Sequence, residues 1–176
     1  MKYEINMDAK IKGFITNLGK YNEGELMGMW ISFPVDEDEL ETVYSEIGIN
    51  EEYEEVFFTD WEYDDIECDF GEYENIEHVN YLAEQLEILT EYDIEKLGVY
   101  LEAINDDLEE ALNELDRCTF WNGYSLEEVA QELAEECGDL RNVPGWIACH
   151  IDWEGVAREL GCDGYYEASN GVLCYQ

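Results

Sequence analysis

Residues 10–33 read KIKGFITNLGKYNEGELMGMWISF, and this stretch decides how the N-terminal part of the chain folds. Its two flanks, residues 10–17 and 25–33, are rich in β-branched and aromatic side chains, which favour β-strands. Between the flanks, GKYNEG contributes two glycines and an asparagine, the residue types that tight turns require. The pattern therefore predicts an antiparallel hairpin.

The predicted hairpin is followed by signals for a helix and a third strand. Asp36 and Glu39 have the spacing of a capping box, in which each side chain bonds the backbone of the other residue. Apolar residues then recur at helical spacing as far as Ile47, and Gly48 is a residue type that ends helices. Residues 55–63 are typical of a strand.

The middle of the chain carries three helical patterns. Asn75, Asp93 and Asp107 are residue types that cap helix N-termini, and apolar side chains follow each of them at spacings of three and four. The sequence therefore predicts three consecutive helices that begin at these residues.

The last third of the chain mixes helices and strands. Ser125 and Glu128 form a second capping box, and Gly138 is expected to end that helix. Two short helices are expected between residues 144 and 160. The final twelve residues, YYEASNGVLCYQ, contain an Asn-Gly turn signal and predict a hairpin.

These patterns predict an α+β fold made of three small modules in a row, with an elongated shape. The length of 176 residues suits one domain or a few small modules. The first module, residues 1–68, combines antiparallel strands with a helix. Residues 69–116 form a helical module, and residues 117–176 form a mixed module that ends in the hairpin.

Charge is the most unusual property of the sequence. The chain has 46 Asp and Glu residues against 8 Lys and Arg, a formal net charge of −38. Its 46% hydrophobic and 14% aromatic residues distinguish it from a disordered acidic tail, so we expect it to fold. Between residues 21 and 95 there are 26 acidic residues and no Lys or Arg. Solubility requires a net charge of only about 2–8 units, so the excess indicates a function.

The density of negative charge resembles that of DNA. Duplex DNA carries one charge per ~1.7 Å of its axis, so 38 charges correspond to roughly 65 Å of duplex. A compact chain of this length would be about 31 Å across, which is why we expect an elongated shape. On a strand, Asp60, Glu62 and Asp64 would lie on one face at intervals of ~6.7 Å. A merely solvated acidic face is the simpler alternative.

We expect a surface that imitates DNA to be carried mainly by acids of the basic-free stretch. The candidate residues are Glu37, Glu41, Glu51, Glu52, Glu54, Asp60, Glu62, Asp64, Asp65, Glu67, Asp69, Glu72 and Glu74.

Enzymatic and metal-binding functions find little support in the sequence. No P-loop, dinucleotide-binding fingerprint or nucleophile elbow is present, so we predict no catalytic residues and no cofactor. The acidic run at Asp36 lacks the glycine of a calcium-binding loop. Cys149 and His150 have no second pair of ligands nearby, so we predict no metal site.

The cysteines and the hydropathy of the sequence indicate the cellular compartment in which the protein is expected. The six cysteines are widely spaced and include no C-x-x-C pair, which favours reduced thiols and a cytoplasmic protein. The longest apolar-rich stretch, residues 26–35, is too short to span a bilayer, so no membrane association is expected. Nucleic acid is also excluded as a partner, because carboxylates and phosphates repel each other.

Three stretches resemble one family, the ArdA antirestriction proteins. They are ITNLGKYNEGELMGMWISFP (15–34), NEEYEEVFFTDWE (50–62) and SLEEVAQELAEECGDLRNVPGWI (125–147). The string NLGKYNEGEL is the most specific of these similarities. The resemblance extends over nearly the whole chain from about residue 9.

The resemblance implies a function, a partner and an assembly. ArdA proteins are carried by mobile genetic elements and imitate bent B-form DNA, and thereby block type I restriction–modification enzymes. They are elongated homodimers that associate largely through the C-terminal region. The antirestriction motif of the family would fall on Leu126, Glu127, Glu128, Val129, Glu132, Leu133, Glu135 and Glu136, with Val129 and Leu133 suited to core or dimer packing.

Three other functions remain open at this stage. An acidic chaperone or sink would bind many basic proteins with similar strength. A halophilic protein would use its acids only to remain hydrated, and would unfold in dilute buffer. A cation buffer would bind calcium measurably.

Overall fold

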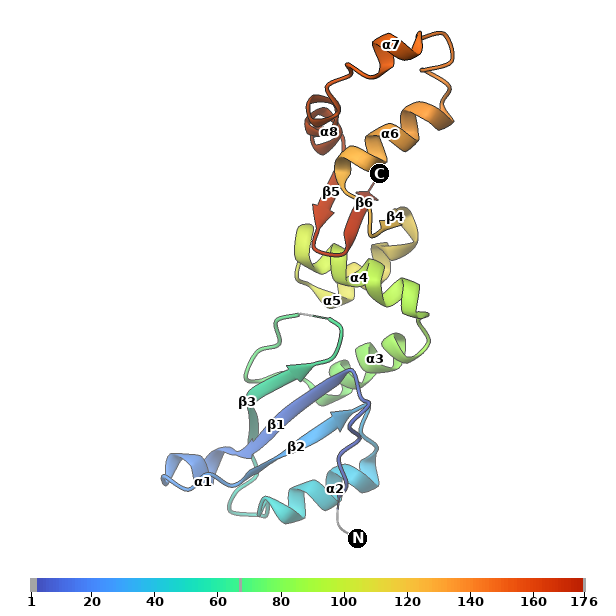
Figure 1. The fold of residues 1–176 in the computed structure, drawn as a ribbon. Helices are drawn as coiled ribbons and strands as arrows, with labels where there is room; N and C mark the ends of the chain where they lie inside the picture. The colour runs from blue at the N-terminus through green and yellow to red at the C-terminus, as the bar shows by residue number, and fades with distance from the viewer. Residues whose placement is uncertain (1–2, 67, 176) are drawn as a thin grey trace. The chain divides into compact units, whose positions relative to one another are not determined.

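The computed structural model describes residues 3–66 and 68–175, which form two compact units, Met1–Thr90 and Glu91–Gln176. Each unit contains a three-stranded antiparallel sheet and several helices (Figure 1). The predicted α+β class is therefore confirmed. The further division into three modules and the elongated shape stay predictions.

The N-terminal unit is built on a sheet with strand order β2-β1-β3. Its elements are β1 (Ile11–Asn17), α1 (Leu18–Asn22), β2 (Gly28–Phe33), α2 (Glu37–Glu46), β3 (Val56–Tyr63) and α3 (Ile76–Glu87). The central strand β1 pairs antiparallel with both neighbours, and its Ile11 and Ile15 are fully buried. Val43 of α2 and Val79 of α3 complete the core with Ile31 of β2.

The connection between β1 and β2 differs from the predicted turn. It contains the short helix α1, and β2 begins at Gly28 rather than at residue 25. The side chain of Asn17 accepts a hydrogen bond from Lys20 N and so caps α1, which the strand pattern could not reveal. Gly24 then adopts a φ of 88°, a left-handed conformation that favours glycine.

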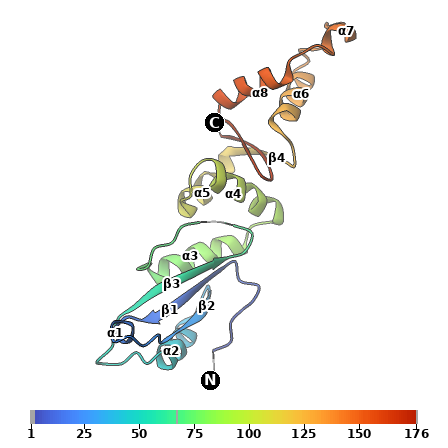
Figure 2. The same ribbon diagram turned by 60° about the vertical axis from the view of Figure 1, so that its left-hand side comes forward.

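The predicted helix signals of this unit are confirmed. Asp36 and Glu39 form both bonds of the capping box of α2, and Asn75 caps α3. The amide of Asn80 in α3 bonds the backbone N and O of Val35 at 2.8 Å each. This pair of bonds ties α3 to the segment between β2 and α2. Figure 2 shows α3 beside the strands of this unit.

The N-terminal segment protects the outer edge of the sheet. Ser32 N in the edge strand β2 donates to the hydroxyl of Tyr3 at 2.7 Å, and Asn6 N donates to Ser32 Oγ at the same distance. Unpaired edge groups can template aggregation, so these bonds have a protective role.

The C-terminal unit has a second sheet, with strand order β4-β6-β5. Its elements are α4 (Glu91–Ala103), α5 (Leu108–Glu114), the 3₁₀-helix η1 (Leu115–Arg117), β4 (Cys118–Asn122), α6 (Leu126–Glu136), α7 (Gly145–Ala148), α8 (Trp153–Cys162), β5 (Tyr165–Ala168) and β6 (Gly171–Tyr175). The terminal hairpin β5–β6 pairs Ala168 with Gly171 across the predicted turn.

Two features of this unit depart from the sequence expectation. Asp93 does not cap a helix, because α4 begins at Glu91 and Asp93 lies in its first turn. An acidic residue is favourable both at the N-cap and in the first turn of a helix, so the residue type alone does not distinguish these two positions. Strand β4 was not predicted, and it is defined by pairing with β6, more than 45 residues later in the chain. Within the described residues, no helix has the length and apolar character needed to cross a membrane.

The second half of this unit has little core of its own. All of residues 131–170 are described, and Ala157 alone among them is buried. Trp146 is 73% exposed and Ile147 is 41% exposed, although both are large and apolar. The helices α6 and α8 pack against each other and leave these side chains uncovered.

Candidate functional site: the acidic surface of the N-terminal unit

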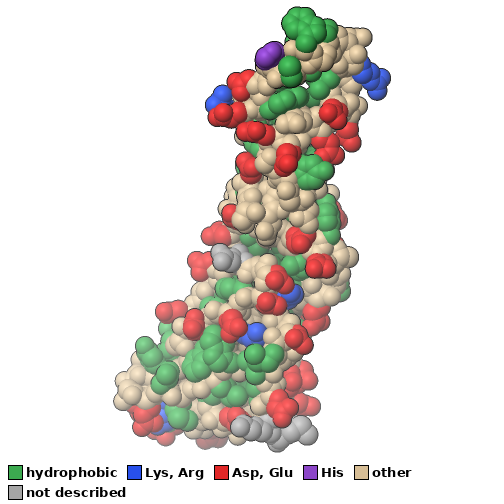
Figure 3. Space-filling model, viewed as in Figure 1, with side chains coloured by type: hydrophobic (Ala, Val, Ile, Leu, Met, Phe, Trp, Pro, Cys, Tyr) green, Lys and Arg blue, Asp and Glu red, His purple; other side chains and the backbone are tan. Residues whose placement is uncertain are grey.

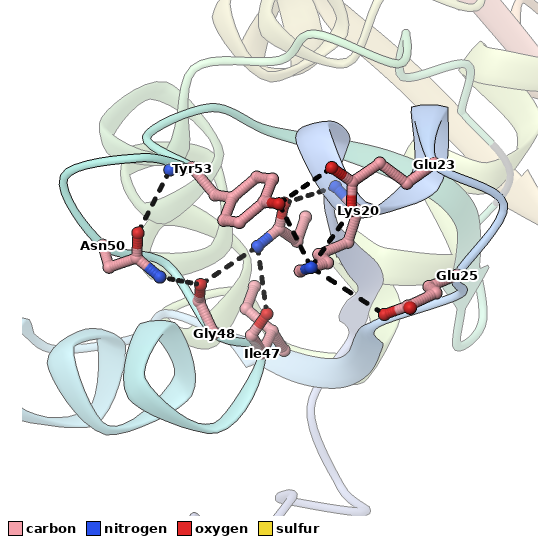
Figure 4. Close-up of polar contacts among 8 residues, drawn as sticks. Lys20, Glu23, Glu25, Ile47, Gly48, Asn50 and Tyr53 are labelled. Atoms are coloured by element: carbon pink, nitrogen blue, oxygen red, sulfur yellow. Dashed lines mark hydrogen bonds and ion pairs between the residues drawn. The ribbon is translucent and has the colours of Figure 1, made fainter.

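A buried asparagine organises the end of the N-terminal unit. Asn17 is fully buried, and its Nδ2 donates to the carbonyl oxygens of Ile47 at 3.1 Å and Gly48 at 3.2 Å. Figure 4 labels these two acceptors, together with Lys20 and Tyr53. Its Oδ1 accepts from Lys20 N at 3.0 Å. One side chain therefore joins the cap of α1 to the C-terminal end of α2.

Lys20 forms the second part of this connection. Its Nζ lies 3.1 Å from Glu23 Oε2 and 3.2 Å from the hydroxyl of Tyr53, which itself bonds Glu23 Oε1 at 2.8 Å. Hydrogen bonds to Tyr53 and Glu23 raise the pKa of Lys20, and bonds from Tyr53 and Lys20 lower the pKa of Glu23. A Cβ at Gly19 would overlap the Tyr53 ring, so only glycine fits there.

The loop that follows α2 presents three of the predicted acids. Asn50 Oδ1 accepts from Glu52 N at 2.8 Å, and the backbone groups of Asn50 and Tyr53 bond each other in both directions. Glu51, Glu52 and Glu54 are all exposed on this turn. Tyr53 links this turn to α1, because its backbone bonds Asn50 and its hydroxyl bonds Lys20.

Strand β3 carries the predicted alternation of acids and aromatics. Asp60 and Glu62 are exposed and pair with Phe14 and Lys12 of β1, on the sheet face opposite the core. Trp61 turns the other way, with its ring 4.3 Å from that of Phe58.

Close packing on the core side of β1 requires a glycine. A Cβ at Gly13 would lie 2.8 Å from the rings of both Phe58 and Trp61, so this position admits no side chain without a rearrangement. Along β3, Asp60 and Glu62 therefore lie on the face opposite Trp61, whereas Asp64 follows the end of the strand at Tyr63 and is not part of the expected row of three.

Three of the predicted acids have lysine partners. Lys12 Nζ lies 3.5 Å from Glu62 Oε1, and Lys10 Nζ lies 3.4 Å from Asp64 Oδ2 and also bonds Asp65. The bond to Asp65 is the main reason that the pKa of Lys10 is raised. Sequence reasoning missed these pairs because they depend on the register between β1 and β3, with partners at least 50 residues apart.

The structure brings most of the candidate acids to the surface. The exposed ones are Glu37, Glu41, Glu51, Glu52, Glu54, Asp60, Glu62, Asp64, Asp65, Asp69 and Glu72. Glu74 is half-buried and accepts a bond from Gly71 N at 3.0 Å. Glu67 lies outside the described residues.

The residues matched to the antirestriction motif lie on α6. Val129 is fully buried, whereas Leu126, Leu133 and Glu132 are half-buried. Glu127, Glu128, Glu135 and Glu136 are exposed. Glu128 completes the capping box with Ser125, whose hydrogen bonds lower the pKa of the Glu128 carboxyl.

Figure 3 shows one face of the N-terminal unit, where hydrophobic side chains gather over the strands and carboxylates surround them. Among the described residues, no group of three or more His, Cys, Asp and Glu side chains is arranged to hold a metal ion. The fold and surface thus define a mixed α/β protein whose N-terminal unit presents many carboxylates from rigid elements.

Comparison with protein-family models matches residues 13–173 to the family described as Antirestriction protein (ArdA). The match spans nearly the whole chain, so the chain belongs to this antirestriction family. A comparison with curated proteins gave no match.

Proposed function

We propose that this protein is a DNA mimic that occupies the DNA-binding groove of type I restriction–modification enzymes. It would act stoichiometrically and competitively, without chemistry of its own. The observation that carries the proposal is the set of eleven exposed candidate carboxylates on β3, α2 and the neighbouring loops of one compact unit. Membership of the antirestriction family supports the same conclusion.

The physical basis is the exchange of ions at a basic groove. A groove that binds DNA holds small anions when it is empty, and any rigid polyanion of suitable spacing can release them. Glu37 and Glu41 stand one helical turn apart, ~6 Å along α2. Asp60 and Glu62 are two residues apart on β3, ~6.7 Å. Each interval corresponds to about two steps of ~3.4 Å, the axial spacing of phosphates along one DNA strand.

We propose further that the protein acts as a homodimer through residues 131–170 of its C-terminal unit. Trp146, Ile147 and Val156 are exposed there, and residues 131–170 bury Ala157 alone. A second copy of the chain would cover these side chains, since exposed apolar patches mark interaction sites. The family resemblance also favours this occupant.

Light scattering coupled to size-exclusion chromatography tests the dimer. We expect a mass of twice the 20.5 kDa chain, and we expect Trp146→Asp to shift the protein toward the monomer. Leu26→Asp is the matched control, because Leu26 is similarly exposed at 67% but belongs to the N-terminal unit. A monomer at micromolar concentration would contradict the proposal.

Competition with DNA on a purified type I enzyme tests the proposed mimicry. The protein should raise the apparent Kd of a labelled duplex in proportion to its concentration and leave saturating activity unchanged. Its own affinity should fall steeply with salt, as the affinity of DNA does. Equal binding to unrelated basic proteins, without competition against DNA, would instead support an acidic chaperone or sink.

A set of matched variants tests whether the charge is distributed. Glu37, Glu41, Glu51, Glu52, Glu54 and Glu72 are exposed and suitable for substitution. Each single Glu→Gln change should weaken inhibition by less than about threefold, and all six together by roughly a hundredfold or more. The sixfold Glu→Asp variant keeps the charge and should keep most of the inhibition. A single substitution that abolished binding would disprove a distributed surface.

A further inference from the structure

Two exposed tyrosines lie against one buried phenylalanine at the edge of the N-terminal sheet. Tyr21 meets Phe57 edge-on, with ring centroids 5.1 Å apart, and Tyr73 stacks on Phe57 with centroids 6.2 Å apart. Phe57 is 6% exposed, whereas Tyr21 is 50% exposed and Tyr73 is 70% exposed. We call Tyr21, Phe57 and Tyr73 the tyrosine shelf.

The shelf is assembled from three separate segments and is fixed by backbone bonds. Tyr21 belongs to α1, whose first residue Leu18 donates from its N to Glu55 O at 3.0 Å. Phe58 N donates to Glu72 O at 2.8 Å, which holds the segment carrying Tyr73 along β3. The two tyrosine rings are therefore held in place and face solvent, although the fold gains little from their exposed surfaces.

Carboxylates border the shelf. Glu55 and Glu72 are exposed and stand within two residues of Phe57 and Tyr73 in the chain. The neighbouring cation Lys20 is engaged by Glu23 and Tyr53, so its charge is already compensated. The shelf thus combines aromatic faces with negative charge.

We propose that the tyrosine shelf binds arginine side chains of the partner protein. A guanidinium is planar and weakly hydrated, so it can stack on an aromatic face while it bonds a carboxylate. A lysine ammonium is more strongly hydrated and gains less from the same surface. This inference rests on the proposed function, since a DNA-binding groove supplies such arginines. It adds a preference for arginine over lysine, which charge alone does not give.

Binding of two synthetic peptides of equal length and charge, (Gly-Arg)₈ and (Gly-Lys)₈, tests the shelf. Fluorescence anisotropy at fixed ionic strength gives the ratio of the two Kd values for each variant. Tyr21→Ala/Tyr73→Ala should lower the preference for the arginine peptide by roughly fivefold or more, because each ring contributes about a two- to fivefold effect. Tyr21→Phe/Tyr73→Phe keeps the rings and should keep most of the preference.

A matched control separates the shelf from tyrosine content in general. Tyr81→Ala/Tyr124→Ala removes two other exposed tyrosines and leaves the charge unchanged, so the peptide preference should stay at the wild-type value. Near-ultraviolet circular dichroism checks that each variant is folded. If the folded Tyr21→Ala/Tyr73→Ala variant keeps the wild-type preference for the arginine peptide, the shelf does not bind arginine as proposed. If the wild-type protein does not compete with DNA but still prefers the arginine peptide, the proposed function is wrong and the arginine-binding role of the shelf stands.

Discussion

Asn17 shows how much of the N-terminal unit depends on one buried amide. Its side chain donates to the carbonyl oxygens of Ile47 and Gly48 at the end of α2 and accepts from Lys20 N in the first turn of α1. No apolar residue can supply these three bonds, and a buried polar group without a partner costs about 1–3 kcal/mol. The first residue of the string NLGKYNEGEL therefore has a structural role.

We predict that Asn17→Ala lowers the free energy of unfolding by about 1–3 kcal/mol, because it removes the donor to the Ile47 carbonyl and the acceptor of Lys20 N, whereas the Gly48 carbonyl keeps its bond from Asn50 Nδ2. Urea denaturation measures this change. Asn22→Ala, at the exposed end of α1, is the control and should change stability by less than about 0.5 kcal/mol. Equal effects of the two substitutions would refute the role assigned to Asn17.

Cys68 gives a prediction about thiol chemistry and pH. Burial raises its pKa to about 12, with a smaller opposing contribution from a hydrogen bond with Tyr63. A raised pKa in the folded state means that the thiol stays protonated at pH 8, where an unfolded cysteine is partly ionised. The neutral form is favoured by folding, so the associated stability is present below pH ~8.5 and is lost as the pH rises toward 12.

Iodoacetamide labelling at pH 8, followed by peptide mass mapping, checks this expectation. Cys68 should react at least a hundredfold more slowly in the native protein than in urea, since only the thiolate is nucleophilic. A native rate within a few fold of the rate in urea would show that Cys68 is not protected.

At the scale of elements, helix beginnings were largely predictable. Asp36, Asn75, Asp107 and Ser125 each cap the helix that they were expected to cap. A cap is a local interaction within about four residues, so a single sequence records it. Asp93 was the exception, since an acid in the first turn has the same composition as a cap.

Elements and contacts that depend on distant residues could not be predicted. Strand β4 exists because it pairs with β6, and helix α1 replaces a turn because Asn17 also reaches the end of α2. Among the candidate acids, exposure was predictable from charge, whereas the lysine partners of Glu62, Asp64 and Asp65 depend on strand register.

The capping box of α6 is testable within the C-terminal unit. Ser125→Ala should lower the stability of that unit by about 1 kcal/mol, because the N–H of Glu128 loses its acceptor. Hydrogen exchange of the α6 amides measures the local change. Glu127→Gln is the control, because its side chain is exposed and is not part of the box. Faster exchange in the control than in Ser125→Ala would contradict the assignment.

At the scale of the whole molecule, net charge lowers stability. A formal charge of −38 on 176 residues opposes compaction by self-repulsion. Salt screens this repulsion, with a Debye length of ~10 Å at 0.1 M. We therefore predict that the melting temperature rises by several degrees between low salt and about 0.3 M NaCl.

Salt should thus strengthen folding and weaken binding to the enzyme, two opposite responses of one charge distribution. Differential scanning fluorimetry and the competition experiment measure them on the same samples. A melting temperature that falls with moderate NaCl would show that specific ion pairs outweigh the general repulsion. Sucrose at matched viscosity controls for changes that are not electrostatic.

The pairing of β1 with β3 contains an irregularity at Thr59. Ile15 stands opposite Phe58 while the preceding Phe14 stands opposite Asp60, so β3 holds one residue more than β1 at this point. Because side chains alternate along a strand, the added residue allows both Phe58 and Trp61 to face inward and both Asp60 and Glu62 to face outward. Deleting Thr59 would not merely shorten the strand. It would reverse the faces of the residues on one side of the deletion. The carboxylates of Asp60 and Glu62 would then point into the interior, and the indole of Trp61 would point into solvent.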